Sequence, residues 1–476
     1  MGQRYCPLDD RQLRQIADAA FEILAGTGMA GVPPGLTAEL VSAGAVARPD
    51  GRVCFPRTMV EDALARAPET VDLPGFTEAH GLTIGGGAVH IGTGGAAVQV
   101  LDAASGAYSE ASLADLYALM RVVEASPNIH YGVRPVVARD IEDPLALDLN
   151  TAFACLKGTA KPIGVSFQSP ENLRATVRLF DMALGAEDAF RRQRFCMGVI
   201  VHVVPPLRYA EEGIATLQAC IAAGMIPQIC SAGQAGATSP VTLAGALAQG
   251  LAECLAGLVM VDHFRAGAPC IYAFMPFVSD LRTGAMTGGG GEGAIANAAA
   301  AQLLRHLGLP STVSAGMTDA KTVDAQAGYE KGYTVALAAH AGADMINLSV
   351  GMLGSIMVAS PEAMVIDDDM CGAILRSARG IEVSGDALDL EMIERVATGE
   401  GHYLAEAQTL ARMKTDYVYP SLADRRSVSE WQQAGSPSLW DRARARVSAI
   451  LAEPPTHLDR AVEQRLREHF PIHLPE

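Results

Sequence analysis

Short apolar runs and longer amphipathic runs alternate along most of this chain. Eight apolar runs have the length of a β-strand, and each precedes a run whose apolar positions recur at helical spacing. The expected strands are residues 96–101, 129–137, 162–167, 196–203, 225–230, 270–274, 311–315 and 345–350. The helix-like runs that follow them are residues 113–125, 145–156, 170–184, 209–223, 240–261, 293–307, 323–341 and 361–378.

Eight strand–helix units predict a (β/α)8 barrel, the TIM barrel fold. The strands are almost continuously apolar, as in a parallel sheet that is covered on both faces. A doubly wound open sheet is the alternative that the pattern leaves open. We expect the barrel at residues 96–380, after an N-terminal helical and β-meander extension (1–95) that includes an amphipathic helix at 10–26. A charged, helix-rich C-terminal appendage (381–476) is expected to pack on the barrel.

Composition narrows the class of protein. Of 476 residues, 49% are hydrophobic, which is enough for a large core. The 36 basic and 53 acidic residues give a net charge of −17, which disfavours nucleic acid or an anionic membrane as partner. Nine scattered cysteines without a C-x-x-C indicate reduced thiols in a cytoplasmic protein without a disulfide framework. The apolar stretch 240–261 contains Gln249 and Glu253, so a buried helix is expected rather than a membrane span.

The richest group of polar side chains lies in the connection after the expected strand 311–315. Barrels build their sites in such connections, at the carboxyl ends of the strands. Lys321 could serve a lyase as a Schiff-base lysine, but the neighbouring Asp319 and Asp324 make an ion pair the simpler interpretation. Gln326 follows in the same segment as a hydrogen-bond donor.

A second pattern places aromatic side chains near the expected barrel mouth. Aromatic rings beside a carboxylate make a cage for a quaternary ammonium ion, although each ring alone is explained equally well by core packing. Asp102 closes the expected strand 96–101 and could supply that carboxylate, or it could begin a turn in D-A-A-S-G. The aromatic residues are Tyr131, Phe167, Tyr272, Phe274, Phe277, Tyr329 and Tyr333.

Two further signals are weak. His202, at the end of a strand, and His263 lack partners at metal-ligand spacing, so no metal site is expected. A G-x-G-x-x-G at 288–293 follows its strand at too great a distance for a dinucleotide fingerprint. A mobile loop over the barrel mouth is the better interpretation of these glycines.

Four longer motifs resemble the trimethylamine methyltransferase family, which contains the corrinoid-dependent glycine betaine methyltransferases. They are P-P-L-R-Y (205–209), A-G-A-T-S-P-V-T-L-A-G-A-L-A-Q (235–249), T-D-A-K-x-x-D-A-Q-A-G-Y-E (318–330) and R-G-I-E-V (379–383). The resemblance implies a (β/α)8 barrel whose central cavity holds a methylated amine. It also implies that the methyl group passes to cobalt in a separate corrinoid protein, so no cofactor is expected to be bound tightly.

The resemblance also implies roles for single residues. It matches Asp102 to the carboxylate that faces the substrate cation, and we group Asp319 and Lys321 with it as catalytic. Family members acting on trimethylamine carry pyrrolysine, which this chain lacks, so a quaternary amine such as a betaine is expected. Where glycine betaine enzymes have a histidine, this chain has Asn347 and Leu348. The expected substrate-binding residues are Tyr131, Phe167, His202, Phe274, Gln326, Tyr329, Tyr333 and Asn347.

Three functions therefore stay open. The first is a methyltransferase whose partners are a small methylated amine and a corrinoid protein. The second is a barrel that binds such an amine without catalysis, if the replaced histidine is essential. The third is a lyase that uses Lys321. A homo-oligomer is expected, but neither its size nor the particular amine follows from the sequence.

Overall fold

Eight parallel strands form a closed ring at the centre of the computed structural model, which describes residues 5–399 and 401–475. Their order is β5-β19-β18-β15-β13-β10-β9-β8, and a parallel bridge between Gly92 and Tyr131 joins the two ends of this sheet. The strands are β5 (His90–Ile91), β8 (Gly132–Val133), β9 (Ile163–Val165), β10 (Cys196–Val201), β13 (Ile226–Ser231), β15 (Ile271–Phe274), β18 (Ser311–Ser314) and β19 (Met345–Asn347).

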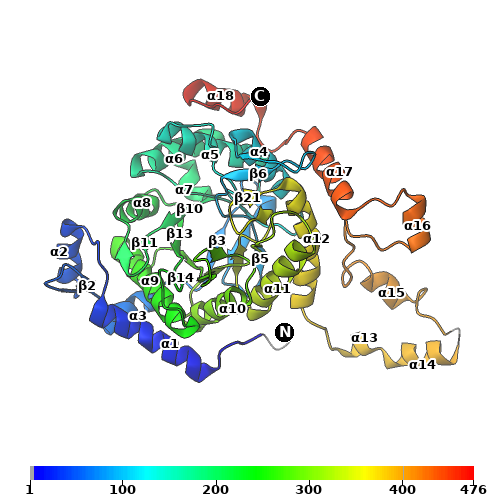
Figure 1. Ribbon diagram of the computed structural model, residues 1–476, viewed down its shortest axis with the longest axis horizontal. Coiled ribbons are helices and arrows are strands. Elements are labelled where there is room, and N and C mark those ends of the chain that lie inside the picture. The colour runs from blue at the N-terminus through cyan, green and yellow to red at the C-terminus, as the bar shows by residue number, and fades with distance from the viewer. Residues whose placement is uncertain (1–4, 400, 476) are drawn as a thin grey trace.

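A layer of helices surrounds this ring (Figure 1). Several begin at a side-chain cap that the sequence provides, such as Ser112, Ser169 and Ser360, and Pro170 and Pro361 follow two of these caps at the first helical position. The predicted (β/α)8 barrel is therefore confirmed, and the open sheet is not formed. The helices are α4 (Leu113–Ala125), α5 (Pro144–Gly158), α6 (Pro170–Leu184), α8 (Glu211–Ala222), α9 (Leu243–Phe264), α10 (Gly291–His306), α11 (Ala325–Ala341) and α12 (Pro361–Ala378).

The first expected strand is wrong as a barrel strand. Residues Gln99–Leu101 form β6, which pairs with β7 (Tyr108–Glu110) and β21 (Val358–Ala359) in a separate sheet that β20 (Met352–Leu353) completes. The ring instead takes β5, so the barrel begins before residue 96. The reason is composition: β5 lies among glycines in G-G-G-A-V-H-I-G-T-G-G and shows no apolar run, whereas A-V-Q-V-L does.

The N-terminal segment covers one side of the barrel and its lower end, which is the end where the parallel strands begin. Helix α1 (Asp10–Glu22) confirms the helix expected at 10–26, continues as a π-helical turn (Ile23–Thr27) and packs on α9. The hairpin β3 (Val71–Leu73) and β4 (Leu82–Ile84) closes the amino end of the ring. The remaining elements of this segment are α2 (Pro34–Ser42), β1 (Val46–Ala47), β2 (Val53–Cys54), α3 (Arg57–Arg66) and a 3-10 turn (Glu78–His80).

Helix α9 is long and apolar enough to cross a membrane, but 89% of its most apolar window is buried inside the protein. It contacts α1, α3, α8 and α10, as well as strands of the ring. Its buried carboxylate, Glu253, accepts hydrogen bonds from the Leu207 amide (3.0 Å), the Ser231 hydroxyl (2.7 Å) and the Gln249 amide (3.1 Å). The stretch is a core helix, as expected.

Smaller elements decorate the connections and the C-terminal appendage. Helix α17 (Leu439–Ala452) packs on α4 and α12, and α18 (Arg460–His469) packs on α6. Helices α13 (Gly385–Leu388), α14 (Leu390–Thr398), α15 (Ala407–Arg412) and α16 (Val428–Gln433) extend away from the barrel (Figure 1). The connections contain α7 (Ala189–Gln193), β11 (Val203–Val204), β12 (Arg208–Tyr209), β14 (Gln234–Ala235), β16 (Phe277–Ser279) and β17 (Met286–Thr287).

Closure of the ring should depend on the missing side chain of Gly92. A Cβ atom there would lie 2.3 Å from a ring carbon of Tyr131, whose side chain is fully buried. We expect Gly92→Ala to destabilise the protein by about 1–3 kcal/mol through overpacking and to lower Tm in calorimetry. Gly81→Ala is the matched control, because no atom lies within 4 Å of a Cβ at that position. Equal melting temperatures for the two variants would contradict this account.

Candidate active site at the mouth of the barrel

The lower part of the barrel lumen is filled with apolar side chains. Strand residues that point inwards pack there against the β3–β4 hairpin, so this end is closed. As far as the described residues show, the open end of the lumen is the carboxyl end of the strands, where barrel sites are built. The packed layer contains Val71, Leu73, Ile84, Val133, Met197, Ile226, Ile271 and Met345.

A buried polar network lies across the middle of the lumen. The Tyr131 hydroxyl donates to Oδ1 of Asn347 (2.6 Å), and Nδ2 of Asn347 donates to Oε1 of Gln228 (3.2 Å). Nε2 of Gln228 then donates to the Thr312 hydroxyl (3.0 Å). Burial raises the pKa of Tyr131 well above its ordinary value, so this phenol stays a neutral donor. The network links four strand segments and forms a rigid, uncharged floor.

An apolar wall stands above this floor on β10, β13 and β15. Cys230, Ala273 and Met275 pack there with the partly buried Val199 and Phe277. Val201 follows Val199 in the same strand alternation and is 57% exposed. Side chains therefore do not fill the lumen at the level of Val201, and the wall is open to the mouth.

The Thr318–Glu330 segment fastens three connections together at the mouth. The carboxylate of Asp319 accepts from the amides of Gly288 (2.8 Å) and Gly289 (3.3 Å) and from the Ser355 hydroxyl (2.6 Å). These partners belong to the β15–α10 and β19–α12 connections, while Asp319 lies between β18 and α11. We call this set of contacts the Asp319 clamp. It gives part of the G-x-G-x-x-G segment a structural role, because the amides of Gly288 and Gly289 bind a carboxylate of the protein itself.

A second carboxylate supports the clamp from α11. Glu330 accepts from the Thr318 hydroxyl (2.5 Å), the Asp319 amide (2.8 Å) and Nε2 of Gln326 (2.9 Å). A Cβ atom on Gly289 would lie 2.2 Å from the Glu330 carboxyl carbon, so the glycine loop sits directly on this side chain. The Tyr333 hydroxyl donates to the Gly289 carbonyl oxygen and holds the other side of the loop.

A hollow of about 520 Å³ lies beside the clamp, between the β13, β15 and β18 connections. Its walls combine apolar side chains, including Val241, Leu243 and Leu281, with four carboxylates. One of these, Asp280, is paired with Arg282 at 2.8 Å, which leaves the hollow net negative. Such a surface favours cations over anions. The carboxylates are Asp280, Glu292, Asp319 and Glu330.

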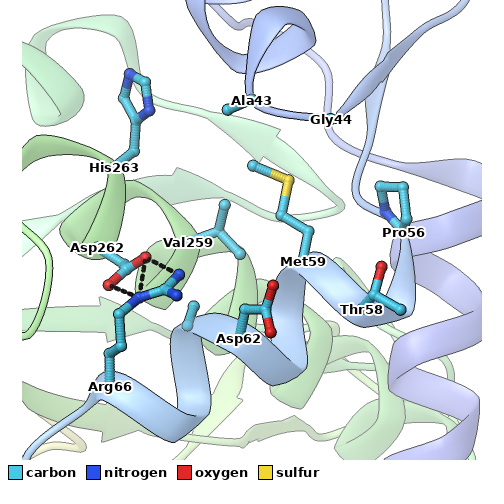
Figure 2. A pocket seen from close by; sticks show the side chains of 11 residues that line it. Ala43, Gly44, Pro56, Thr58, Met59, Asp62, Arg66, Val259, Asp262 and His263 are labelled. Atoms are coloured by element: carbon cyan, nitrogen blue, oxygen red, sulfur yellow. Dashed lines mark hydrogen bonds and ion pairs between the residues drawn. The ribbon is translucent and has the colours of Figure 1, made fainter.

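A separate hollow of about 210 Å³ lies on the outside of the barrel, between α3 and α9. Figure 2 shows that the Arg66–Asp262 ion pair joins α3 to α9 at one side of this hollow and that His263 points away from this pair. Nε2 of His263 contacts the Glu39 carboxylate at 3.1 Å. This hollow lies where the N-terminal segment packs on the barrel, away from the mouth.

The structure brings only some of the expected site residues to the mouth. Tyr131 and Asn347 meet in the lumen floor, and Asp319, Gln326 and Tyr333 meet in and around the clamp. Tyr329, although on the same helix, is 60% exposed and points to solvent. Aromatic rings therefore do not surround the open part of the lumen in the way the cage hypothesis expected.

The ring-strand position expected for Asp102 and the ion pair expected for Lys321 are not observed. Asp102 follows β6 outside the ring, in an exposed turn where it accepts from the Ser105 hydroxyl (2.6 Å) and the Ala104 amide (3.1 Å). The Ser105 hydrogen bonds lower its pKa, and this is the turn that D-A-A-S-G allowed. Nζ of Lys321 donates to the main-chain oxygen of Asp319 (2.6 Å) rather than to a carboxylate, and its side chain is exposed.

Three other expected residues point away from the lumen. The ring of Phe274 packs against Gly250 of α9, and Phe167 is partly buried against the main apolar core rather than in the cluster that lines the lumen wall. Nε2 of His202 donates to the Glu253 carbonyl oxygen on α9 (3.0 Å). Burial lowers the pKa of His202 to about 4, so it is neutral. The sequence placed these residues correctly near the carboxyl ends of their strands. Successive side chains of a strand point to opposite faces, however, and these three point to the outer face of the barrel.

Sequence reasoning missed Gln228, Thr312, Glu330 and Ser355 as parts of the mouth. Gln228 carried a usable signal, since it is the one strongly polar residue inside the apolar strand I-P-Q-I-C. Glu330 lies within the quoted family motif. Ser355 gave no signal, because its contact to Asp319 joins residues 36 positions apart.

Together, the closed ring, its plugged lower end and its built mouth define a TIM-barrel protein whose site faces the carboxyl ends of the strands. Residues 2–471 match the trimethylamine methyltransferase (MTTB) family, and the chain belongs to this family. The glycine betaine methyltransferase of Desulfitobacterium hafniense (strain Y51) is 30% identical over 480 residues, which cover 98% of this chain and 97% of that protein. The trimethylamine methyltransferase MttB of Methanosarcina barkeri is 32% identical over 409 residues, covering 84% and 81% of the two chains.

A solved structure has the same fold. The monomethylamine methyltransferase MtmB of Methanosarcina barkeri superposes with a TM-score of 0.50 over 94% of this chain and 96% of that chain. The sequences are 13% identical in this comparison, so the likeness concerns the fold alone. It supports the TIM-barrel assignment independently of the sequence motifs.

The Asp319 clamp can be tested by hydrogen exchange. In Asp319→Ala the amides of Gly288 and Gly289 lose their acceptor, and a hydrogen bond to a charged group contributes roughly 1.5–3 kcal/mol. We expect exchange in peptides that span 286–292 to accelerate at least about tenfold. Lys321→Met is the control from the same connection, because its ammonium group contacts only a main-chain oxygen. Unchanged exchange in Asp319→Ala would exclude the clamp.

Proposed function

We propose that this protein transfers a methyl group from a quaternary amine, such as a betaine, to the cobalt of a separate corrinoid protein. The observation that carries the proposal is the end-to-end similarity to a glycine betaine methyltransferase, combined with a lumen whose open end is the mouth. Membership of the family supports the reaction class. The particular amine and the corrinoid acceptor are part of the proposal.

The reaction asks for binding and orientation rather than for acid–base chemistry. When the N–CH3 bond of a quaternary amine breaks, its electron pair stays on nitrogen and a neutral tertiary amine leaves. The reduced corrinoid supplies the electron pair for the new cobalt–carbon bond. The residues of this chain then need to hold the cation beneath the opening and keep water out. A floor without a titrating acid suits this task, because no proton has to move.

The lumen has the surfaces that such a substrate requires. N-methyl groups cannot form hydrogen bonds, so they bind where apolar side chains such as Val199, Ala273 and Met275 replace water. The polar floor at Tyr131 and Asn347 limits how deep the amine can descend. We infer that the reacting methyl group points from this wall towards the mouth, where a corrinoid can approach.

Asn347 favours a working site over a disabled one. It stands where the betaine branch is expected to have a histidine, yet both ends of its amide are used, one by Tyr131 and one by Gln228. If the site had lost its activity, there would be no reason for residue 347 to be an amide whose acceptor and donor both have hydrogen-bond partners. The replacement therefore supports a changed substrate rather than the binding-only alternative.

Long-range attraction of the cation is assigned to the mouth carboxylates rather than to Asp102. Glu292, in the first turn of α10, is exposed at the edge of the 520 Å³ hollow. Strand β16 borders both this hollow, through Val278, and the apolar wall, through Phe277. Lys321 lies outside the lumen with its amine bound to a carbonyl oxygen, and this position gives the lyase alternative no support.

A spectroscopic assay tests the reaction. Purified protein is mixed with cob(I)alamin and, separately, with glycine betaine, other betaines, carnitine, choline or trimethylamine. We expect the methylcobalamin spectrum with at least one quaternary amine and none with trimethylamine, because loss of a methyl group from this neutral amine would expel a dimethylamide anion. Transfer from trimethylamine alone would refute the substrate class. Amine binding in calorimetry without any transfer would favour the binding-only function.

Charge removal tests the mouth. We expect Glu292→Gln to weaken binding of the reactive amine about twofold to fivefold, and to do so less at high salt, because the carboxylate is exposed and screened. Asp102→Asn is the control, since its carboxylate is engaged in its own turn outside the ring. The measurement is calorimetric affinity at low and high ionic strength. A larger loss of affinity in Asp102→Asn than in Glu292→Gln would show that Asp102, not Glu292, contacts the substrate.

A further inference from the structure

Residues 380–399 and 401–414 form a projection that we call the arm. It leaves the barrel at the end of α12, runs outwards through α13 and α14, and returns through α15. Figure 1 shows these helices beside the ring, on the side opposite α2. At its base, the Arg379 side chain donates to the Thr415 carbonyl oxygen (3.1 Å), and Arg376 donates to that of Asp416. The direction of the arm is therefore fixed by the barrel.

Polar contacts hold the two halves of the arm together. Arg395 makes two hydrogen bonds to the Glu406 carboxylate, at 2.9 and 2.8 Å. Arg412 pairs with Glu382 at 2.6 Å, and these contacts raise the pKa of Arg412 and lower that of Glu382. The arm is thus a preformed hairpin rather than a loose chain.

The apolar side chains of the arm face outwards. In its described residues, Val396 is the one large apolar side chain that is buried. Exposure reaches 89% at Ile381 and 80% at Leu404. A water-soluble element normally has the reverse arrangement, with apolar groups inside and ions outside. The side chains that are more than half exposed are Ile381, Val383, Leu388, Leu390, Leu404 and Leu410.

The exposed area of the arm, summed over these six residues, is comparable to what one partner buries in a stable interface. At their exposed fractions, these six residues present on the order of 800 Å². Monomeric proteins rarely leave an apolar patch of more than about 300–600 Å² open to water. Stable interfaces bury about 800 Å² on each partner, and those of permanent complexes are the more apolar ones.

We propose that the arm is the interface through which two copies of this chain associate. A second copy presents the same apolar hairpin, so a two-fold contact pairs like with like. A methyl acceptor that visits the mouth has to dissociate after each turnover, which suits a smaller and more polar contact. It would also have to lie over the mouth, whereas the arm lies beside the ring (Figure 1). The proposal does not depend on the methyl-transfer reaction.

The mass of the protein in solution tests the proposal. Light scattering after size exclusion should give a dimer, or a larger even-numbered oligomer, for the natural chain at about 1 μM and above. Ile381→Glu combined with Leu390→Glu should raise the dissociation constant at least about a hundredfold and give monomers, because each carboxylate would be buried without a partner. A second pair, Ile381→Ser with Leu404→Ser, removes the apolar surface without adding charge. Val46→Glu, which is 54% exposed on the N-terminal segment, is the control.

Folding is checked in the same samples. All these side chains are exposed, so circular dichroism should not change, while Tm should rise with protein concentration only in the associating proteins. A monomeric natural chain at 50 μM (roughly fifty times the expected threshold), or an arm variant of unchanged mass, would overturn the proposal. The proposal would also be overturned if the natural chain were a monomer that binds a corrinoid protein and the arm variants did not bind it. The arm would then be the docking site of that partner.

Discussion

Closure of the strand ring rests on one close approach, between the bare backbone of Gly92 and the ring of Tyr131. Any side chain at residue 92 would overlap that ring, which is buried completely. With the approach allowed, the first and last strands of the sheet meet, and the Tyr131 hydroxyl reaches past β5 to Asn347 on β19. The same contact therefore closes the barrel and builds the floor of its lumen. The apolar wall, the mouth and the surrounding helices are all built on this closed ring of strands.

The mouth is built by a different kind of interaction. The connections at the mouth pair with one another only in short strands, and two carboxylates supply hydrogen-bond acceptors for the residues between these strands. Asp319 holds the glycine loop and Ser355, and Glu330 holds Asp319 in turn. The family motif at 318–330 is thus first a structural device, which fixes the opening above the lumen. Its charge also makes the mouth attractive to cations, so structure and proposed function use the same residues.

Much of the fold could be predicted from the sequence, because buried strands and amphipathic helices have distinct periodicities. Seven of the eight ring strands overlap the expected runs. The exception, His90–Ile91, is short and lies among glycines, so its place in the ring is set by neighbours far away in the chain. The expected site residues were placed correctly only in part. Tyr131 and Asn347 meet in the lumen, whereas Asp102 lies outside the ring.

By itself the sequence determined the alternation of elements, the family and the segment that shapes the mouth, since each is written in local patterns of residues. Only the tertiary structure decided which strand-end side chains face inwards. Phe274 and His202 end strands as expected, but one step in the strand alternation turns them towards α9. The tertiary structure also decided that the apolar side chains around Leu390 are exposed to solvent. Burial is a property of distant segments brought together, and a local pattern does not contain it.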